Sequence, residues 1–164
     1  MLDSENTEFS IVVVDATKLN KLARFYYRGA GEIVRYFKIL KEAGRLLVAT
    51  EVTVERAWQS FKRKSFFKNR SEEQKFEKLY HGKVNILIDR IVPTNVYQAF
   101  IPEADLILQD TDWQKEDAHV LACAIAYSYT GLMTSIWTDD GDFLSKAEII
   151  ESRFGIKVFS LVDY

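Results

Sequence analysis

Short apolar runs recur along the chain, and five of them have the pattern of a β-strand buried inside a sheet. Residues 11–14 form a continuous β-branched run, and shorter runs follow at 46–49, near the end of 84–92, at 132–137 and at 156–159. Continuous apolar runs, as opposed to alternating ones, are typical of strands that helices cover on both faces. We therefore expect a mainly parallel sheet of about five strands.

Between these runs, apolar residues recur at helical spacing. Thr17 and Thr50 are suited to cap the helices that follow them, and His81–Gly82 predicts a helix break. The predicted helices lie at about 17–28, 31–43, 51–62, 71–80, 95–108, 113–129 and 144–152. Strands that alternate with helices predict a three-layer α/β/α sandwich. We expect one domain over residues 1–164, with residues 1–9 as a loose lead-in.

Composition narrows the class of protein. The 164-residue chain is 48% apolar, contains no run of the roughly 20 apolar residues that span a bilayer, and does not begin like a signal peptide. We expect a soluble, cytoplasmic protein. Cys123 is the single cysteine, which excludes an internal disulfide and predicts a small buried residue. The two histidines, His81 and His119, are too few for a histidine-based zinc site unless carboxylates complete it.

The net charge of −2 conceals two oppositely charged regions. Residues 57–71 contain five basic residues and no acidic one, whereas residues 101–152 contain eleven acidic residues and two basic ones. Such separation predicts two surfaces with different binding partners.

The densest group of acids follows the predicted strand 132–137, where Asp139, Asp140 and Asp142 lie within four residues. Like charges this close repel one another, so either a cation or a solvated surface turn must accommodate them. Asp15 follows the first strand, and Asp117 begins the helix that precedes the acidic turn.

Glu55 completes the predicted group of acids, one turn into the helix after the second strand. Ligands of open parallel sheets bind beyond the carboxyl ends of the strands, so these acids are expected at one rim. Carboxylates gathered there suit Mg²⁺ or Mn²⁺.

The order and spacing of these pieces resemble the PIN-domain family, metal-dependent ribonucleases that include the VapC-type toxins. The first strand with Asp15 resembles the family's first strand and acid, and residues 48–55 resemble its second strand and the helix with a late acid. Residues 117–124 resemble its Asp followed by an alanine-rich helix, and residues 138–143 its closing turn.

The resemblance implies an endoribonuclease in which Asp15, Glu55, Asp117, Asp140 and Asp142 are catalytic. All of these except Glu55 are expected to ligate Mg²⁺ or Mn²⁺, with Asp15 and Asp140 as the main ligands. The phosphodiester would be hydrolysed by water with the ions stabilising the developing charge.

The resemblance leaves open which glutamate of the helix after the second strand belongs to the site. Glu51 competes with Glu55 for the role of the site glutamate, and as a first-turn acid it also favours the helix dipole. Thr138 is expected to hydrogen-bond a water molecule in the coordination shell of the metal, and Asp139 to point outward into solvent.

The resemblance also implies RNA as partner and allows a homodimer or a protein antitoxin.

A pocket of carboxylates repels phosphate, so basic residues elsewhere are expected to hold the RNA. The predicted contacts lie in the basic region and are Lys62, Arg63, Lys64, Lys68 and Arg70, with phenylalanines among them that could stack on bases. The alternative is a helix whose cationic end favours its dipole and whose phenylalanines face the core.

Three other functions fit parts of the sequence. A catalytically silent PIN-like scaffold that binds RNA or protein stays open, since the acids alone do not show turnover. A phosphatase of the haloacid-dehalogenase type needs an acid two residues after Asp15, where this chain has Thr17. A phosphorylation receiver needs a phosphoacceptor Asp after a middle strand and a late lysine, and neither is evident.

Overall fold

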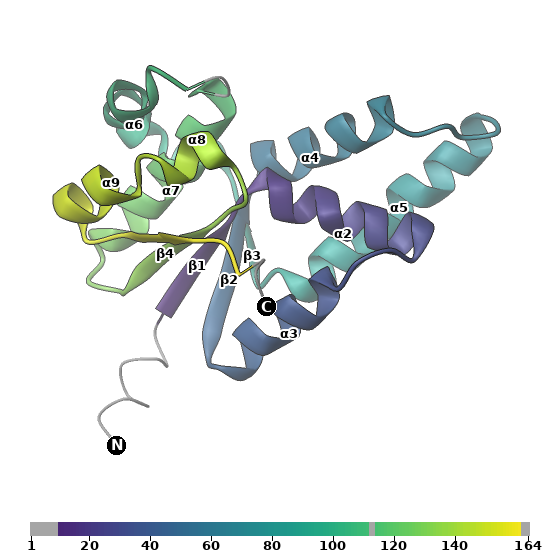
Figure 1. The fold of residues 1–164 in the computed structure, drawn as a ribbon, viewed down its shortest axis with the longest axis horizontal. Coiled ribbons are helices and arrows are strands. Elements are labelled where there is room, and N and C mark those ends of the chain that lie inside the picture. Colours follow the sequence, from purple (N-terminus) through teal and green to yellow (C-terminus); the bar gives the residue numbers. More distant parts are fainter. Residues whose placement is uncertain (1–9, 112–113, 162–164) are drawn as a thin grey trace.

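The computed structural model describes residues 10–111 and 114–161, which form a five-stranded, entirely parallel sheet with helices on both faces (Figure 1). The strands are β1 (Ser10–Val14), β2 (Arg45–Thr50), β3 (Arg90–Val92), β4 (Thr134–Trp137) and β5 (Lys157–Phe159). Their order across the sheet is β3-β2-β1-β4-β5. The predicted three-layer α/β architecture is confirmed, and each predicted apolar run supplies one strand.

Two hydrophobic cores lie on opposite faces of the sheet, as alternate residues of a strand must point to opposite sides. Val12 and Val14 pack with one group of helices, and Ile11 and Val13 with the other. The first group is α2 (Ala16–Arg28), α3 (Ile33–Glu42), α4 (Glu51–Arg63) and α5 (Arg70–Leu87). The second is η1 (Thr94–Val96), η2 (Gln98–Phe100), α6 (Ile101–Leu108), α7 (Gln114–Ser128), α8 (Gly141–Leu144) and α9 (Ala147–Phe154).

Two predicted helices differ from those observed. The helix expected over residues 95–108 is two short 3₁₀ turns followed by α6, whose start is set by Pro102 in its first turn. The break predicted at His81–Gly82 is wrong, because α5 continues through both residues. The buried side chains of Tyr80 and Val84 hold this helix in the core that it shares with α2 and α4, and their packing outweighs the cost of about 1 kcal/mol for a helical glycine.

Other local predictions concern single residues. The Thr50 hydroxyl accepts a hydrogen bond from the Thr53 N–H and caps α4 as expected. Cys123 is buried, and burial raises its thiol pKa to about 12, in agreement with its predicted role as a core residue. The predicted lead-in at residues 1–9 lies outside the described residues. Among the described residues, the helices are too short or too polar to cross a membrane.

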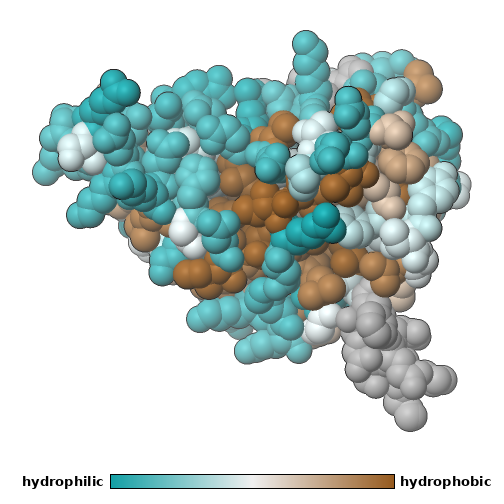
Figure 2. Space-filling model, turned by 180° about the vertical axis from the view of Figure 1, so that it is seen from behind, coloured by the Kyte–Doolittle hydropathy of each residue, from teal (hydrophilic) through white to brown (hydrophobic). Residues whose placement is uncertain are grey.

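Helices α4 and α5 project from the body as an arm (Figure 1). Aromatic rings fill the space between this arm and α2, with Tyr27 in edge contact with Phe61 and Phe76. Phe66, in the turn that joins α4 to α5, is 96% exposed. On the side turned away in Figure 1, hydrophobic residues gather over the middle of the surface (Figure 2).

The strand order brings distant segments together at one point. β1 is flanked by β2 on one side and by β4 on the other, so the chain turns to opposite sides of the sheet after β1 and after β4. Such a switch in strand order leaves room for a ligand beyond the carboxyl ends of the strands. Here Asp15 follows β1, and Thr138, Asp139 and Asp140 follow β4.

Candidate active site

Three carboxylates from separate parts of the chain converge at this switch point. Asp15 follows β1, Asp140 precedes α8, and Asp117 lies in the first turn of α7. Asp15 and Asp117 are only 3% and 4% exposed. All three line one pocket.

Thr138 fixes the positions of two of these acids. Its hydroxyl donates a hydrogen bond of 2.6 Å to Oδ2 of Asp15 and accepts one of 3.0 Å from the Asp140 N–H. The Asp142 N–H in turn donates to Oδ1 of Asp140 at 3.0 Å. Thr138 is completely buried. Its hydroxyl therefore links Asp15, at the end of β1, to the backbone of the acidic turn in a place that water does not reach.

The surroundings of Asp117 disfavour the charged form of its carboxyl group. Burial, followed by the charges of Asp15 and Asp140, raises its pKa to about 9. Burial also raises the pKa of Asp15. Among the described residues, the buried Oδ2 of Asp117 has no hydrogen-bond partner.

A divalent cation would relieve both features of Asp117. Metal ions that prefer oxygen ligands bind carboxylates of this kind, and binding replaces the proton that repulsion otherwise favours. The donors are all oxygens, which suits Mg²⁺ or Mn²⁺ better than a metal that prefers sulfur or nitrogen. The residues present therefore fit such an ion.

Asp139 does not point into solvent, and this prediction is wrong. Lys18, which is 0% exposed, donates to Oδ1 of Asp139 at 2.6 Å, and Lys21 pairs with its other oxygen. The Lys18 ammonium also lies 5.0 Å from the centre of the Trp137 ring. The Asp139 N–H donates to the Thr17 hydroxyl at 2.9 Å. The start of α2 therefore clamps the acidic turn, because a buried ammonium requires a carboxylate partner.

The pocket has a volume of about 350 Å³ and walls of opposite charge. The acidic residues of its lining are Asp15, Glu116, Asp117, Asp139 and Asp140, and the basic residues are Lys21, Arg24, Arg56 and Lys64. The basic residues come from α2 and from α4 with the residue that ends it, and these two helices pack side by side (Figure 1). The pocket can hold a cation and an anion next to each other.

A family model described as PIN domain matches residues 28–152. The chain belongs to the PIN domain family. The matched residues include Asp117 and Asp140, while Asp15 lies before them. No curated protein matches the chain.

The fold of this PIN domain is also found among solved structures. The crystal structure of FitAcB from Neisseria gonorrhoeae superimposes with a TM-score of 0.56 over 91% of this chain and 96% of that one. The two sequences are 16% identical over this match, so the similarity is one of fold.

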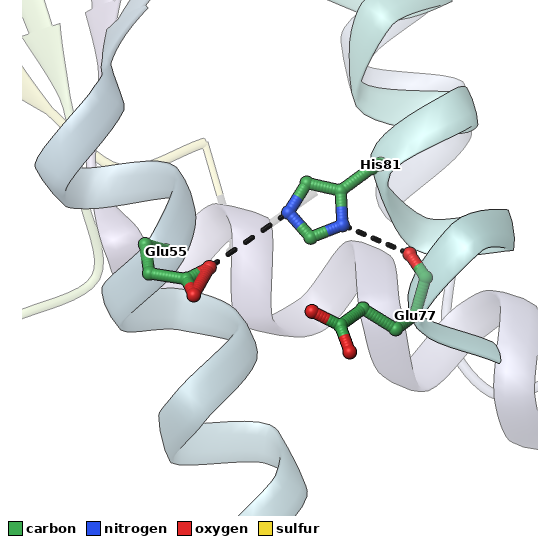
Figure 3. A group of neighbouring side chains, drawn as sticks. All are labelled: Glu55, Glu77 and His81. Carbon is green, nitrogen blue, oxygen red and sulfur yellow. Dashed lines mark hydrogen bonds and ion pairs between the residues drawn. The ribbon is translucent and has the colours of Figure 1, made fainter. Parts of the chain in front are cut away.

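Glu55 points away from the pocket of this PIN domain. It faces α5, where its Oε2 lies 3.8 Å from Nε2 of His81, and Glu77 lies beside them (Figure 3). These three residues offer ligand atoms within 4.8 Å of one another, in a group separate from the three aspartates. The predicted catalytic role of Glu55 stays a prediction that its position does not favour.

Two further predicted acids are outside the pocket lining as well. Glu51 is exposed at the start of α4, and its charge acts on Tyr97. Asp142 contributes its N–H to Asp140, as described above, and its metal role stays a prediction. Neither Glu51 nor Glu55 therefore supplies the pocket lining with an acid from α4.

The predicted RNA-binding residues fall into separate places. Lys64 lines the acidic pocket, whereas Lys62 and Arg70 line a different hollow at the end of the arm with the exposed Phe66. Arg63 and Lys68 line neither hollow. Of the basic region, Lys64 alone is thus placed next to the predicted chemistry.

Sequence reasoning missed Glu116, Arg56, Lys21 and the buried Lys18. Arg56 and Glu116 form an ion pair of 3.2 Å at the pocket. The signal available in the sequence was helical spacing, since Arg56, Ser60 and Lys64 recur every four residues and share one face of α4. Which face meets the site depends on the packing of α4 on α2.

Proposed function

We propose that this PIN domain is a Mg²⁺- or Mn²⁺-dependent endoribonuclease. The observation that carries the proposal is the convergence of Asp15, Asp117 and Asp140 at a pocket that also presents basic side chains. Within the part of the chain that the structure describes, the buried Oδ2 of Asp117 has no hydrogen-bond partner. Clustered oxygen ligands next to cationic groups suit the hydrolysis of a phosphodiester. Such chemistry would serve an RNA-processing enzyme or a toxin.

Each residue of the site has a defined task in this proposal. Asp15, Asp117 and Asp140 would hold the ion, which supplies Lewis-acid stabilisation of the phosphate and lowers the pKa of water. Thr138 orients Asp15 and the backbone of Asp140. The Lys18–Asp139 pair keeps the acidic turn against β1, so that the ligands are placed before the ion arrives.

The test is cleavage of labelled single-stranded RNA by the purified protein with Mn²⁺, followed on a denaturing gel. Wild type is expected to cut internally, and EDTA to stop it. Asp140→Asn is expected to lower the rate by more than the 10- to 100-fold that is typical for loss of a supporting residue. Circular dichroism would verify that the variant is folded. Absence of Mn²⁺-dependent cleavage, or undiminished cleavage by Asp140→Asn, would contradict the proposal.

A further inference from the structure

Residues of α2 and α4 line the part of the pocket that we call the groove. On α2, Thr17, Lys21 and Arg24 lie on one face at intervals of three and four residues, and all line the groove. On the other side, Arg56 and Lys64 lie two turns apart along α4 and form the opposite wall. The groove thus has cationic side chains from both helices, and the acids line the same pocket.

A hydrogen bond links the two helices that line the groove, in addition to their side-chain packing. The Asn20 side chain donates to the carbonyl oxygen of Ala57 at 3.4 Å, which ties the middle of α2 to α4. Lys21 is engaged by Asp139 near the acids. Arg24 and Lys64 are exposed further out, where they can contact a ligand.

Arg56 lies at the inner end of the groove, where the two kinds of charge meet. Its guanidinium pairs with Glu116 at 3.2 Å, and Glu116 directly precedes Asp117 in α7. The side chains of Arg56 and Glu116 are 30% and 28% exposed, so both are accessible to a ligand in the groove. A guanidinium presents several N–H donors in one plane, so Arg56 can bind a phosphate while Glu116 still orients it.

We propose that Arg56 binds the phosphate next to the bond that is cut, and that Arg24 and Lys64 bind phosphates further along one strand of RNA. From Arg56 to Lys64, α4 rises about 12 Å, the length of roughly three stacked nucleotides. The proposal rests on the proposed nuclease function and names the residues that hold its substrate.

The experiment measures RNA binding separately from cleavage. Binding of a fluorescein-labelled 12-nucleotide RNA to the Asp140→Asn protein is followed by fluorescence anisotropy at several salt concentrations. Adding Arg56→Gln is expected to weaken binding about tenfold or more, since hydrogen bonds to charged groups are worth about 1.5–3 kcal/mol. The slope of log K against log salt is expected to fall by about 0.7, because one fewer phosphate is neutralised. Arg56→Lys is expected to recover part of the affinity.

Arg153→Gln is the matched control, since Arg153 also forms a surface ion pair with a glutamate, Glu103, at 3.4 Å and lies outside the groove. It is expected to leave affinity and salt slope unchanged. Equal binding by the Arg56→Gln and Arg153→Gln proteins would overturn the proposal. If the proposed RNA contacts were overturned in this way while wild type still cleaved RNA with Mn²⁺, the proposed nuclease function would stand without them.

Discussion

Asp117 is a residue of the site whose charged form the fold disfavours. Its pKa of about 9 means that the folded, metal-free protein holds a proton there at neutral pH, whereas the unfolded chain releases it above about pH 4. Between these values the folded state binds more protons than the unfolded state. The stability that this group contributes is therefore complete at low pH and is lost as the pH rises toward 9.

Metal affinity is expected to show the opposite dependence on pH. An ion that binds Asp117 displaces its proton, so affinity for Mn²⁺ should rise by up to about tenfold per pH unit between about pH 6 and pH 8. Isothermal titration calorimetry at several pH values measures this slope. Asp117→Asn, which carries no such proton, is expected to bind more weakly and with a flatter slope. An affinity that does not change with pH in wild type would show that metal binding displaces no proton from Asp117 and would contradict this prediction.

At the scale of elements, the site depends on a clamp between the start of α2 and the turn after β4. Lys18→Met keeps much of the side-chain volume but leaves Asp139 with Lys21 alone. Because Lys18 is fully buried, we expect a loss of roughly 3 kcal/mol in the free energy of unfolding. Lys21→Met, at a side chain that is 36% exposed, is expected to cost less than about 1 kcal/mol.

Urea denaturation of both lysine variants measures the difference. The double variant Lys18→Met with Asp139→Asn is expected to lose less free energy of unfolding than the two single variants lose in sum, because the two residues form one ion pair. Equal losses for Lys18→Met and Lys21→Met would show that the clamp does not depend on the buried ammonium.

The elements were predictable where the sequence pattern alone decides them. Runs such as 11–14 and 132–137 have the composition of buried strands, and each forms one. The break predicted at His81–Gly82 was wrong, because a glycine weakens a helix by less than the packing of Tyr80 and Val84 contributes. Local propensity is thus overruled where a helix has a long buried face.

The site was predictable in part for a related reason. Asp15 and Asp140 follow strands whose ends must meet at one rim, so topology alone brings them together. The acids of α4 depend instead on how the helix is rotated. Val54 and Trp58 face the core, which leaves Glu55 on the side toward α5 and Arg56 on the side toward the pocket. A sequence shows which residues share a helix face. Which of these faces packs against a neighbouring helix is decided by the tertiary structure.

At the scale of the whole molecule, the fold divides its surface into regions with different chemistry. The acidic site and the cationic groove lie together at the carboxyl ends of the strands. Elsewhere a broad hydrophobic area covers part of the opposite view (Figure 2), and surfaces of this kind often mark protein interfaces. The expected homodimer and protein antitoxin stay predictions, and the cytoplasmic location does as well.

The proposed function depends above all on a divalent cation held jointly by Asp15, Asp117 and Asp140. The most direct measurement is a crystal of the protein soaked in Mn²⁺, with anomalous diffraction used to locate the metal. An anomalous peak between these three carboxylates, at oxygen distances of about 2.0–2.3 Å, is the predicted result. A peak at Glu55, Glu77 and His81 alone, or no peak at the three aspartates, would contradict the proposed metal site.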